Sequence, residues 1–225
     1  MTTDRRAKAS FLLAELIVVL LGVLIALGVD SWWQGRAERG RELAYLRSIN
    51  ADLAVTVESL QSAIESDSAI FNRLDSALVV LWGQEDVAVQ ELSRLVAIVL
   101  PPFKLNIGTL NALVGTGDIG LVQSEPLRSQ LIAGAARFSE GYDGTQSVLS
   151  RAADNARGLI IELTRLQLES ERPEVLLASM RRSPVFIGSV SLHQNYIRNQ
   201  LIYLRDMREA GDELIDAIQQ ELDRR

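Results

Sequence analysis

The chain has 225 residues, and its 23 Lys and Arg against 29 Asp and Glu give a net charge of −6 at pH 7. This acidic balance disfavours nucleic-acid binding, because cationic side chains must replace the counterions of the phosphates. With no cysteine and one histidine, thiolate metal sites and disulfides are excluded and histidine clusters are disfavoured, so we expect no cofactor, no nucleic-acid partner and no enzymatic activity.

An apolar run, FLLAELIVVLLGVLIALGV, occupies residues 11–29, and Glu15 is its only charged residue. At about 1.5 Å per helical residue, the run just crosses a hydrocarbon core of roughly 30 Å. Trp32 and Trp33 follow it, as is typical of aromatic residues at a membrane interface, although the core of a soluble helix would also accommodate them. We therefore predict a transmembrane helix over residues 11–33.

The parts on either side of this span set its expected orientation. Basic residues flank both ends, so the charge rule alone does not decide between the two orientations. Residues 34–225 are enough for one core-forming domain, and long domains cross the membrane largely regardless of charge. We expect residues 1–10 to be a cytoplasmic tail and residues 34–225 to be a periplasmic domain of a bacterial inner-membrane protein.

After the span, apolar residues alternate at spacings of three and four, the heptad pattern of a coiled coil. The predicted register is Leu43, Leu46, Asn50, Leu53, Val57, Leu60, Ile64, Asp67, Phe71, Leu74, Leu78 and Leu81. Asn50 and Asp67 are polar residues within this register, and two interpretations are open. If they are buried, they fix the register and the number of helices; alternatively, the contact between the helices is open to water at these positions. No proline interrupts this part, so one helix is predicted from the span to Gly83.

The middle of the chain is predicted to connect the long helices through short helices and turns. A short helix is expected over residues 87–100, before two consecutive prolines, and another over 110–114. The glycines of GTGDIG, residues 115–120, fit a helix end and a tight turn and not a phosphate-binding loop, because no strand precedes them. Ser124 is predicted to cap the helix that follows.

Two further long helices are predicted, over residues 127–171 and 187–222, with a short helix between Pro173 and Pro184. Gly141 and Gly144 are expected to bend or break the first one, since glycine costs about 1 kcal/mol relative to alanine inside a helix. The expected fold is therefore all-α. A transmembrane helix continues into a bundle of about three long helices with short connecting helices.

Three residues inside the span are candidate contacts between membrane helices. Gly22 and Ala26 are small and four residues apart, which lets two helices approach closely. Glu15 either pairs with a basic residue in the tail of a neighbouring copy or extends to water at the headgroup level. We therefore predict a homo-oligomer or a helical membrane-protein partner, in addition to the lipid bilayer.

Two segments of the sequence carry a recognisable combination of motifs. Residues 14–53 carry Ala-Glu before the apolar run, Ile-Ala-Leu near its end, and tryptophan before a charged helix; residues 109–131 read TLNALVGTGDIGLVQSEPLRSQL. Together they resemble an uncharacterised family of small bacterial single-span membrane proteins, and the resemblance implies membrane anchoring but no activity. Ala14 stands where the family has glycine, and Asp-Ser-Trp-Trp at residues 30–33 stands where it has Asn-Asn-Trp.

A second resemblance is to type IV pilins and secretion pseudopilins. Glu15 is the fifth residue from Phe11 and basic residues precede it, as in those subunits. Ser10 stands where they have glycine, however, and the sequence lacks a strand-rich body. We therefore keep a pilin-like function as an alternative and favour the first resemblance.

The patterns favour a membrane-anchored helical bundle that oligomerises or docks a membrane partner. An envelope sensor or signalling accessory is the alternative, and it needs a partner because the tail is too short for an output domain. A hydrolase using Glu162, Glu169 and Glu171 is disfavoured, since such acidic spacings are common on solvated helix faces. His193 has no acid or second imidazole one helical turn away, so we predict a packing or surface role for it.

Overall fold

The computed structural model describes residues 3–83, 88–96, 103–170 and 172–224, with side chains from residue 20 onward. This part of the chain contains α-helices, one 3-10 helix and no strand, which confirms the predicted all-α class. In chain order the elements are α1 (Thr3–Trp82), α2 (Val89–Leu95), α3 (Gly108–Gly115), η1 (Asp118–Leu121), α4 (Glu125–Leu168), α5 (Pro173–Arg182) and α6 (Pro184–Asp223).

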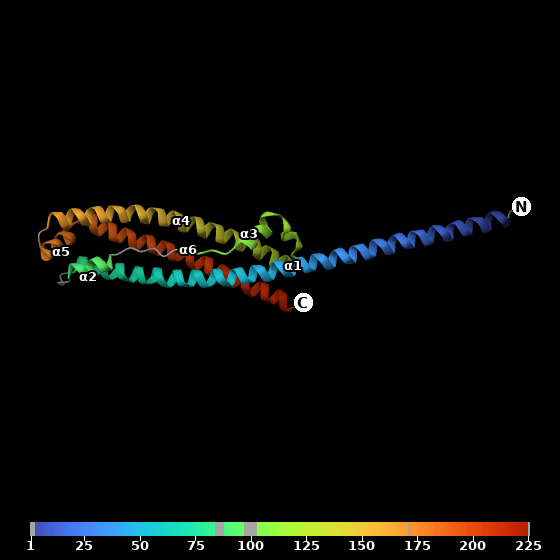
Figure 1. Cartoon of the computed structure of the whole chain (residues 1–225), viewed down its shortest axis with the longest axis horizontal. Coiled ribbons are helices and arrows are strands. Elements are labelled where there is room, and N and C mark those ends of the chain that lie inside the picture. Colours follow the sequence, from blue (N-terminus) through green and yellow to red (C-terminus); the bar gives the residue numbers. More distant parts are fainter. Residues whose placement is uncertain (1–2, 84–87, 97–102, 171, 225) are drawn as a thin grey trace.

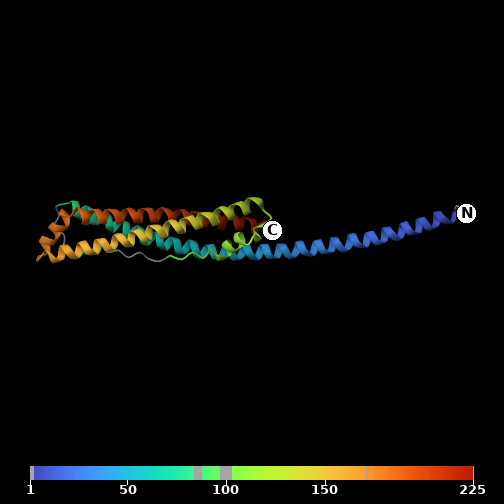
Figure 2. The same ribbon diagram turned by 90° about the horizontal axis from the view of Figure 1, so that it is seen from above.

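The second half of α1 forms a bundle with α4 and α6, and the first half projects from it as a stalk (Figure 1). α6 packs along both other long helices and runs antiparallel to each (Figures 1 and 2). α2 and α5 lie at the distal end of the bundle, away from the stalk. α3, η1 and the C-terminus lie at the proximal end, where the stalk emerges. The predicted bundle of three long helices is confirmed.

The core face of α1 follows a strict heptad, although its register differs from the predicted one. The buried residues at spacings of three and four are Leu46, Ile49, Leu53, Thr56, Leu60, Ala63, Asp67, Ile70, Leu74, Ala77 and Leu81. The predicted register is correct at every second position, including Asp67. Of the other predicted positions, Ile64 and Leu78 are also buried, whereas at Leu43, Asn50, Val57 and Phe71 the buried residue is the preceding one. Ile49 takes the fully buried position, and Asn50 is only half-buried. Because α1 packs on α6 on one side and on the connector on the other, its buried face is wider than a two-helix seam.

α4 is one unbroken helix of 44 residues, so the predicted break at Gly141 and Gly144 is wrong. Gly134 and Gly141 lie where α4 meets α6, and the side chains of Leu214 and Met207 fill the space that a Cβ atom would occupy. Glycine is a poor helix former, but here it lets the two helices approach closely. The packing contacts therefore offset the low helix propensity.

The helix ends follow local sequence signals. Ser124 and Ser183 cap α4 and α6, and each is followed by proline in the first turn. Gly117 has φ 85°, a left-handed conformation that favours glycine, which confirms the predicted turn after α3. The helix predicted over residues 87–100 is described only as α2, and the rest of that range lies largely outside the described residues.

Candidate functional site

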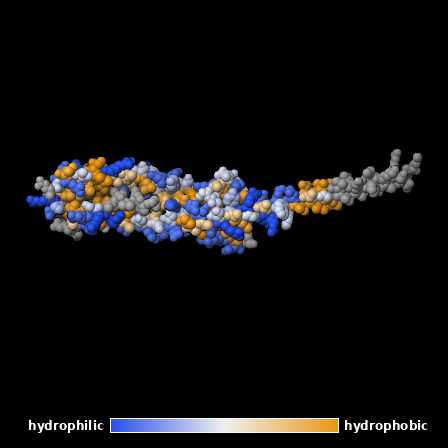
Figure 3. Space-filling view, viewed as in Figure 1, coloured by the Kyte–Doolittle hydropathy of each residue, from blue (hydrophilic) through white to orange (hydrophobic). Residues whose placement is uncertain are grey.

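The stalk exposes large apolar side chains on all of its sides. They are between 51% and 67% exposed, and they are Leu20, Leu21, Val23, Leu24, Ile25, Leu27, Val29, Trp32 and Trp33. Figure 3 shows this segment as a hydrophobic band, followed by a hydrophilic one next to the bundle. Successive residues of a helix point in different directions, so a single partner helix would cover only part of this band.

Two of the three predicted intramembrane contacts, Gly22 and Ala26, find no partner among the described residues. Gly22 has open space where a Cβ atom would stand, and Ala26 is exposed. The side chain of Glu15 lies outside the described residues, as do all side chains of residues 11–19. Among the described residues, no helix is both long enough and apolar enough to cross a bilayer. Membrane anchoring and helix pairing stay predictions.

Each long helix of the bundle contributes a buried polar side chain at one level of the core. These are Asp67 of α1, Thr145 of α4 and Gln200 of α6, and none has exposed surface. Thr145 follows Gly144, whose neighbour on α6 is Tyr203, so Thr145 lies level with Gln200 to within one turn. We call these three residues the polar layer.

The packing of α1 on α6 places Asp67 at the same level. Gln194 donates a hydrogen bond to Asp75 at 3.0 Å, and Gly211 lies against Val57. Because the two helices are antiparallel, these pairs place Asp67 opposite the middle of α6, close to Gln200. Among the described residues, the polar side-chain atoms of the polar layer have no hydrogen-bond partner. A buried polar group without a partner lowers stability, so this layer is costly for the fold.

Burial shifts the ionisation of two core residues in opposite directions. It raises the pKa of Asp67 to about 6, because the carboxylate loses its hydration. It lowers the pKa of His193 to about 4, because the imidazolium is disfavoured in the same way. His193 lies one heptad from Gln200, has no exposed surface, and neither ring nitrogen has a partner among the described residues. The structure therefore places His193 as a packing residue.

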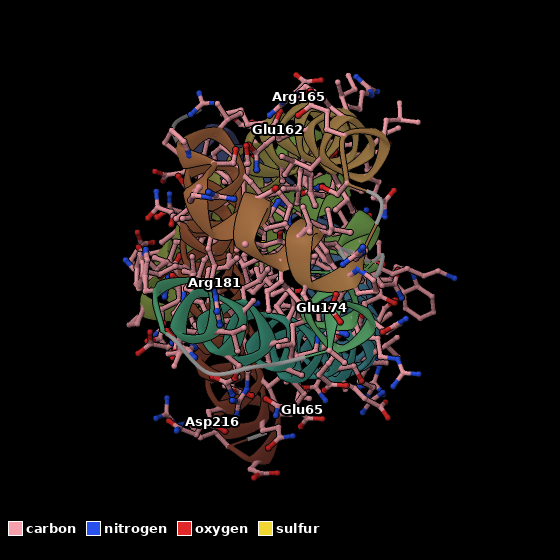
Figure 4. All side chains as sticks on the ribbon, turned by 90° about the vertical axis from the view of Figure 1, so that its left-hand side faces the viewer. Glu65, Glu162, Arg165, Glu174, Arg181 and Asp216 are labelled. Atoms are coloured by element: carbon pink, nitrogen blue, oxygen red, sulfur yellow. The ribbon has the colours of Figure 1, made fainter. Side chains whose placement is uncertain are left out.

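Glu162 and Glu169, two of the three acidic residues considered for hydrolysis, belong to an ionic cluster around Arg165. Figure 4 shows Glu162 next to Arg165 at the distal end of the bundle. Arg165 donates hydrogen bonds to Glu162 at 2.9 and 2.7 Å and to Glu169 at 2.8 and 2.7 Å, and Ser183 donates to Glu162 at 2.7 Å. The bonds from Arg165, and then the one from Ser183, lower the pKa of Glu162 to about 2. Glu171 lies outside the described residues. A carboxylate held in its ionised form is a poor proton donor, so the cluster is suited to joining helices.

No match to this chain is found among family models, curated proteins or solved structures. The resemblance to small bacterial single-span membrane proteins therefore stays a prediction.

The cap at Ser183 leads to a first prediction. Its Oγ accepts a hydrogen bond from the N–H of Phe186 at 3.1 Å and donates one to Glu162. Replacing Ser183 by alanine is expected to lower the free energy of unfolding by about 1–2 kcal/mol, measured by urea denaturation with helical circular dichroism. Ser124→Ala is the control: it loses one longer cap bond, 3.5 Å from Leu127, and should cost less than half as much. Equal losses would contradict the bridging role of Ser183.

Proposed function

We propose that this protein is a membrane-anchored interaction protein. Its N-terminal apolar segment inserts into the bilayer, and α1 holds the helical bundle next to the membrane. There the bundle contacts copies of itself or a membrane partner. The observation that carries the proposal is the stalk, whose large apolar side chains are exposed on all sides over residues 20–33.

The physical argument is the cost of leaving this segment in water. Burying one large aliphatic side chain contributes about 1.5–3 kcal/mol, and several are exposed here in succession. A helix that is apolar on all sides requires apolar surroundings on all sides, which a bilayer supplies. The tryptophan pair lies where the apolar band ends, before the charged stretch that begins at Arg36. That order matches the aromatic belt at a membrane surface.

Two other functions share this anchor. An envelope sensor or signalling accessory would use the bundle for recognition and would need a partner for its output. A pilin-like subunit would combine a similar apolar helix with a strand-rich body, and the described residues contain no strand. The helical bundle therefore favours the interaction protein over the pilin.

The test is retention in membranes. The full-length chain is expected to stay in the pellet after an alkaline carbonate wash, whereas Leu24→Arg/Ile25→Arg should release it. Each central arginine costs roughly 2.5–3.5 kcal/mol of insertion free energy. Val55→Arg/Val79→Arg is the matched control: it adds the same charges at exposed positions of α1 within the bundle, so the chain should remain in the pellet. A wild-type chain in the soluble fraction would refute the anchor.

A further inference from the structure

Residues 103–106 run as an extended segment along α1, and Ile107, with ψ 16°, turns the chain into α3 (Figure 1). The N–H of Lys104 donates a hydrogen bond to Ser59 Oγ at 3.0 Å. The N–H of Asn106 donates to Thr56 Oγ1 at 2.8 Å, and the Thr56 hydroxyl makes a 3.2 Å bond to the C=O of Asn106. Alternate residues of the segment are therefore fixed to α1 through their backbone.

The residue between them presents its backbone to the other side. In an extended chain, successive N–H and C=O groups point in opposite directions. Because Lys104 and Asn106 bond to α1 through their backbone, the N–H and C=O of Leu105 face away from α1. Within the described residues, no group donates to or accepts from the Leu105 backbone. An unpaired extended edge of this kind accepts another extended chain.

A groove of about 950 Å³ opens beside this edge. Residues 103–107 line it, and Ala135, Ser139 and Tyr142 of α4 contribute to its lining. Phe103, Leu105 and Ile107 pack against the core of the bundle, so the groove floor is apolar. The groove thus combines an unpaired backbone edge with apolar surface, as sites for extended peptides do.

The charge of the groove indicates which kind of ligand would bind in it. Among the described residues that line the groove, Lys104 is the only charged one, and it forms no ion pair with any described acid. The protein as a whole carries a net charge of −6, so a lone cation here is the exception. A carboxylate on the occupant would complement this ammonium group.

We propose that the groove between residues 103–107 and α4 binds an extended peptide. The peptide pairs with the backbone of Leu105, places apolar side chains in the groove at alternate positions, and sets a carboxylate beside Lys104. This inference deepens the proposed interaction role by naming the chemistry of the partner. It does not depend on membrane insertion, because every residue that it uses belongs to the bundle.

The probe is a fluorescein-labelled peptide of seven residues in which valine alternates with threonine and one central glutamate. It is titrated by fluorescence anisotropy against the full-length chain in phospholipid nanodiscs, with empty nanodiscs as the blank. Saturable binding is expected. The same peptide with methylated backbone nitrogens keeps its side chains but loses its donors, and it should bind at least about tenfold more weakly. Equal binding of the methylated peptide would show an apolar filler, such as a lipid chain, and would overturn the proposal.

Variants of α4 test the location. Ser139→Trp places an indole in the groove, and it should weaken peptide binding at least about tenfold. Ala136→Trp adds the same indole to an exposed position of α4 that does not line the groove, so affinity should change less than about twofold. Equal affinities for the two variants would overturn the proposal.

Lys104 gives a test of charge and a second test of location. Lys104→Gln should weaken binding of the glutamate peptide about two- to fivefold and leave a glutamine peptide unaffected. Lys104 is the only lysine after Lys8, so carbodiimide coupling of the glutamate peptide should mark Lys104, as read by mass spectrometry. Failure of the probe to bind at millimolar concentration would overturn the peptide site. A chain that binds the peptide but is released from membranes would refute only the anchor.

Discussion

Replacing Asp67 by asparagine is expected to raise the free energy of unfolding at pH 8 by up to about 3 kcal/mol, and to change it little at pH 4. Asp67 has no exposed surface, and among the described residues neither carboxylate oxygen has a partner. Burial raises its pKa from 3.8 to about 6. Asparagine has nearly the same shape and carries no charge, so it removes the cost of the buried anion.

The direction follows from the protons bound in each state. Below pH 3.8 the Asp67 carboxyl is protonated in both the folded and the unfolded chain, and its charge costs nothing. As the pH rises toward 6, the unfolded chain has lost this proton and the folded chain still holds it, so stability falls. Above the folded pKa, the cost is complete. The measurement is urea denaturation of the full-length chain in detergent, followed by helical circular dichroism between pH 4 and pH 8.

His193→Gln is the matched control, and its effect should have the opposite pH dependence. Burial lowers the pKa of His193 from 6.5 to about 4, so the unfolded chain takes up a proton first and stability is lost as the pH falls through this window. Glutamine should therefore add up to about 3 kcal/mol at pH 4 and have no ionisation effect at pH 8. In the natural chain the two dependences oppose each other between pH 4 and pH 6. Parallel profiles for the Asp67 and His193 variants would contradict this account.

The polar layer lowers the stability of the fold, but it can select one register of the three helices. Asp67, Thr145 and Gln200 come from three different helices and share one level of the bundle. If α6 slid by one heptad so that Met207 took the place of Gln200, Gln200 would meet an apolar layer and the other two residues would lose their polar neighbour. A slide in the other direction would place His193 at their level instead of Gln200. Buried polar residues at a helix seam select one register in this way, at the expense of stability.

Much of the bundle could be predicted because its signals are local. The heptad leucines, the serine caps and Gly83 mark helices and their ends through short-range chemistry. The finer register could not be predicted, because core positions such as Thr56, Ala63 and Ala77 are small or polar and do not stand out from surface residues. Only the packing of α1 against α6 and the connector decides that these residues are buried.

The candidate sites, too, could be predicted from the sequence only in part. Asp67 could be found because it interrupts a long run of apolar register positions, whereas Thr145 and Gln200 look like ordinary surface residues of α4 and α6. A signal for Gln200 existed, since it stands seven residues after His193 and seven before Met207, all fully buried. The groove beside residues 103–107 had no such signal, because the tertiary fold alone brings this segment alongside α4.

Replacing Gly134 by alanine is expected to lower the free energy of unfolding by about 1–3 kcal/mol, although alanine is the better helix former. A Cβ atom at this position would lie 3.0 Å from Cγ of Leu214 and closer still to Cδ1. Either α4 moves away from α6 or Leu214 leaves its preferred rotamer, and both cost packing energy. Gly158, also in α4, has open space around it, so Gly158→Ala should instead add about 0.5–1 kcal/mol.

A double-mutant cycle separates the close contact from helix propensity. Leu214→Ala alone should cost about 2–5 kcal/mol, because it leaves a cavity in the core. In the Leu214→Ala background, Gly134→Ala should no longer destabilise, since the added methyl enters the space that leucine has left. The cost of the alanine at residue 134 then changes sign between the two backgrounds. If Gly134→Ala and Gly158→Ala both stabilise the natural chain, α4 and α6 do not approach closely, and glycine at the seam needs another explanation.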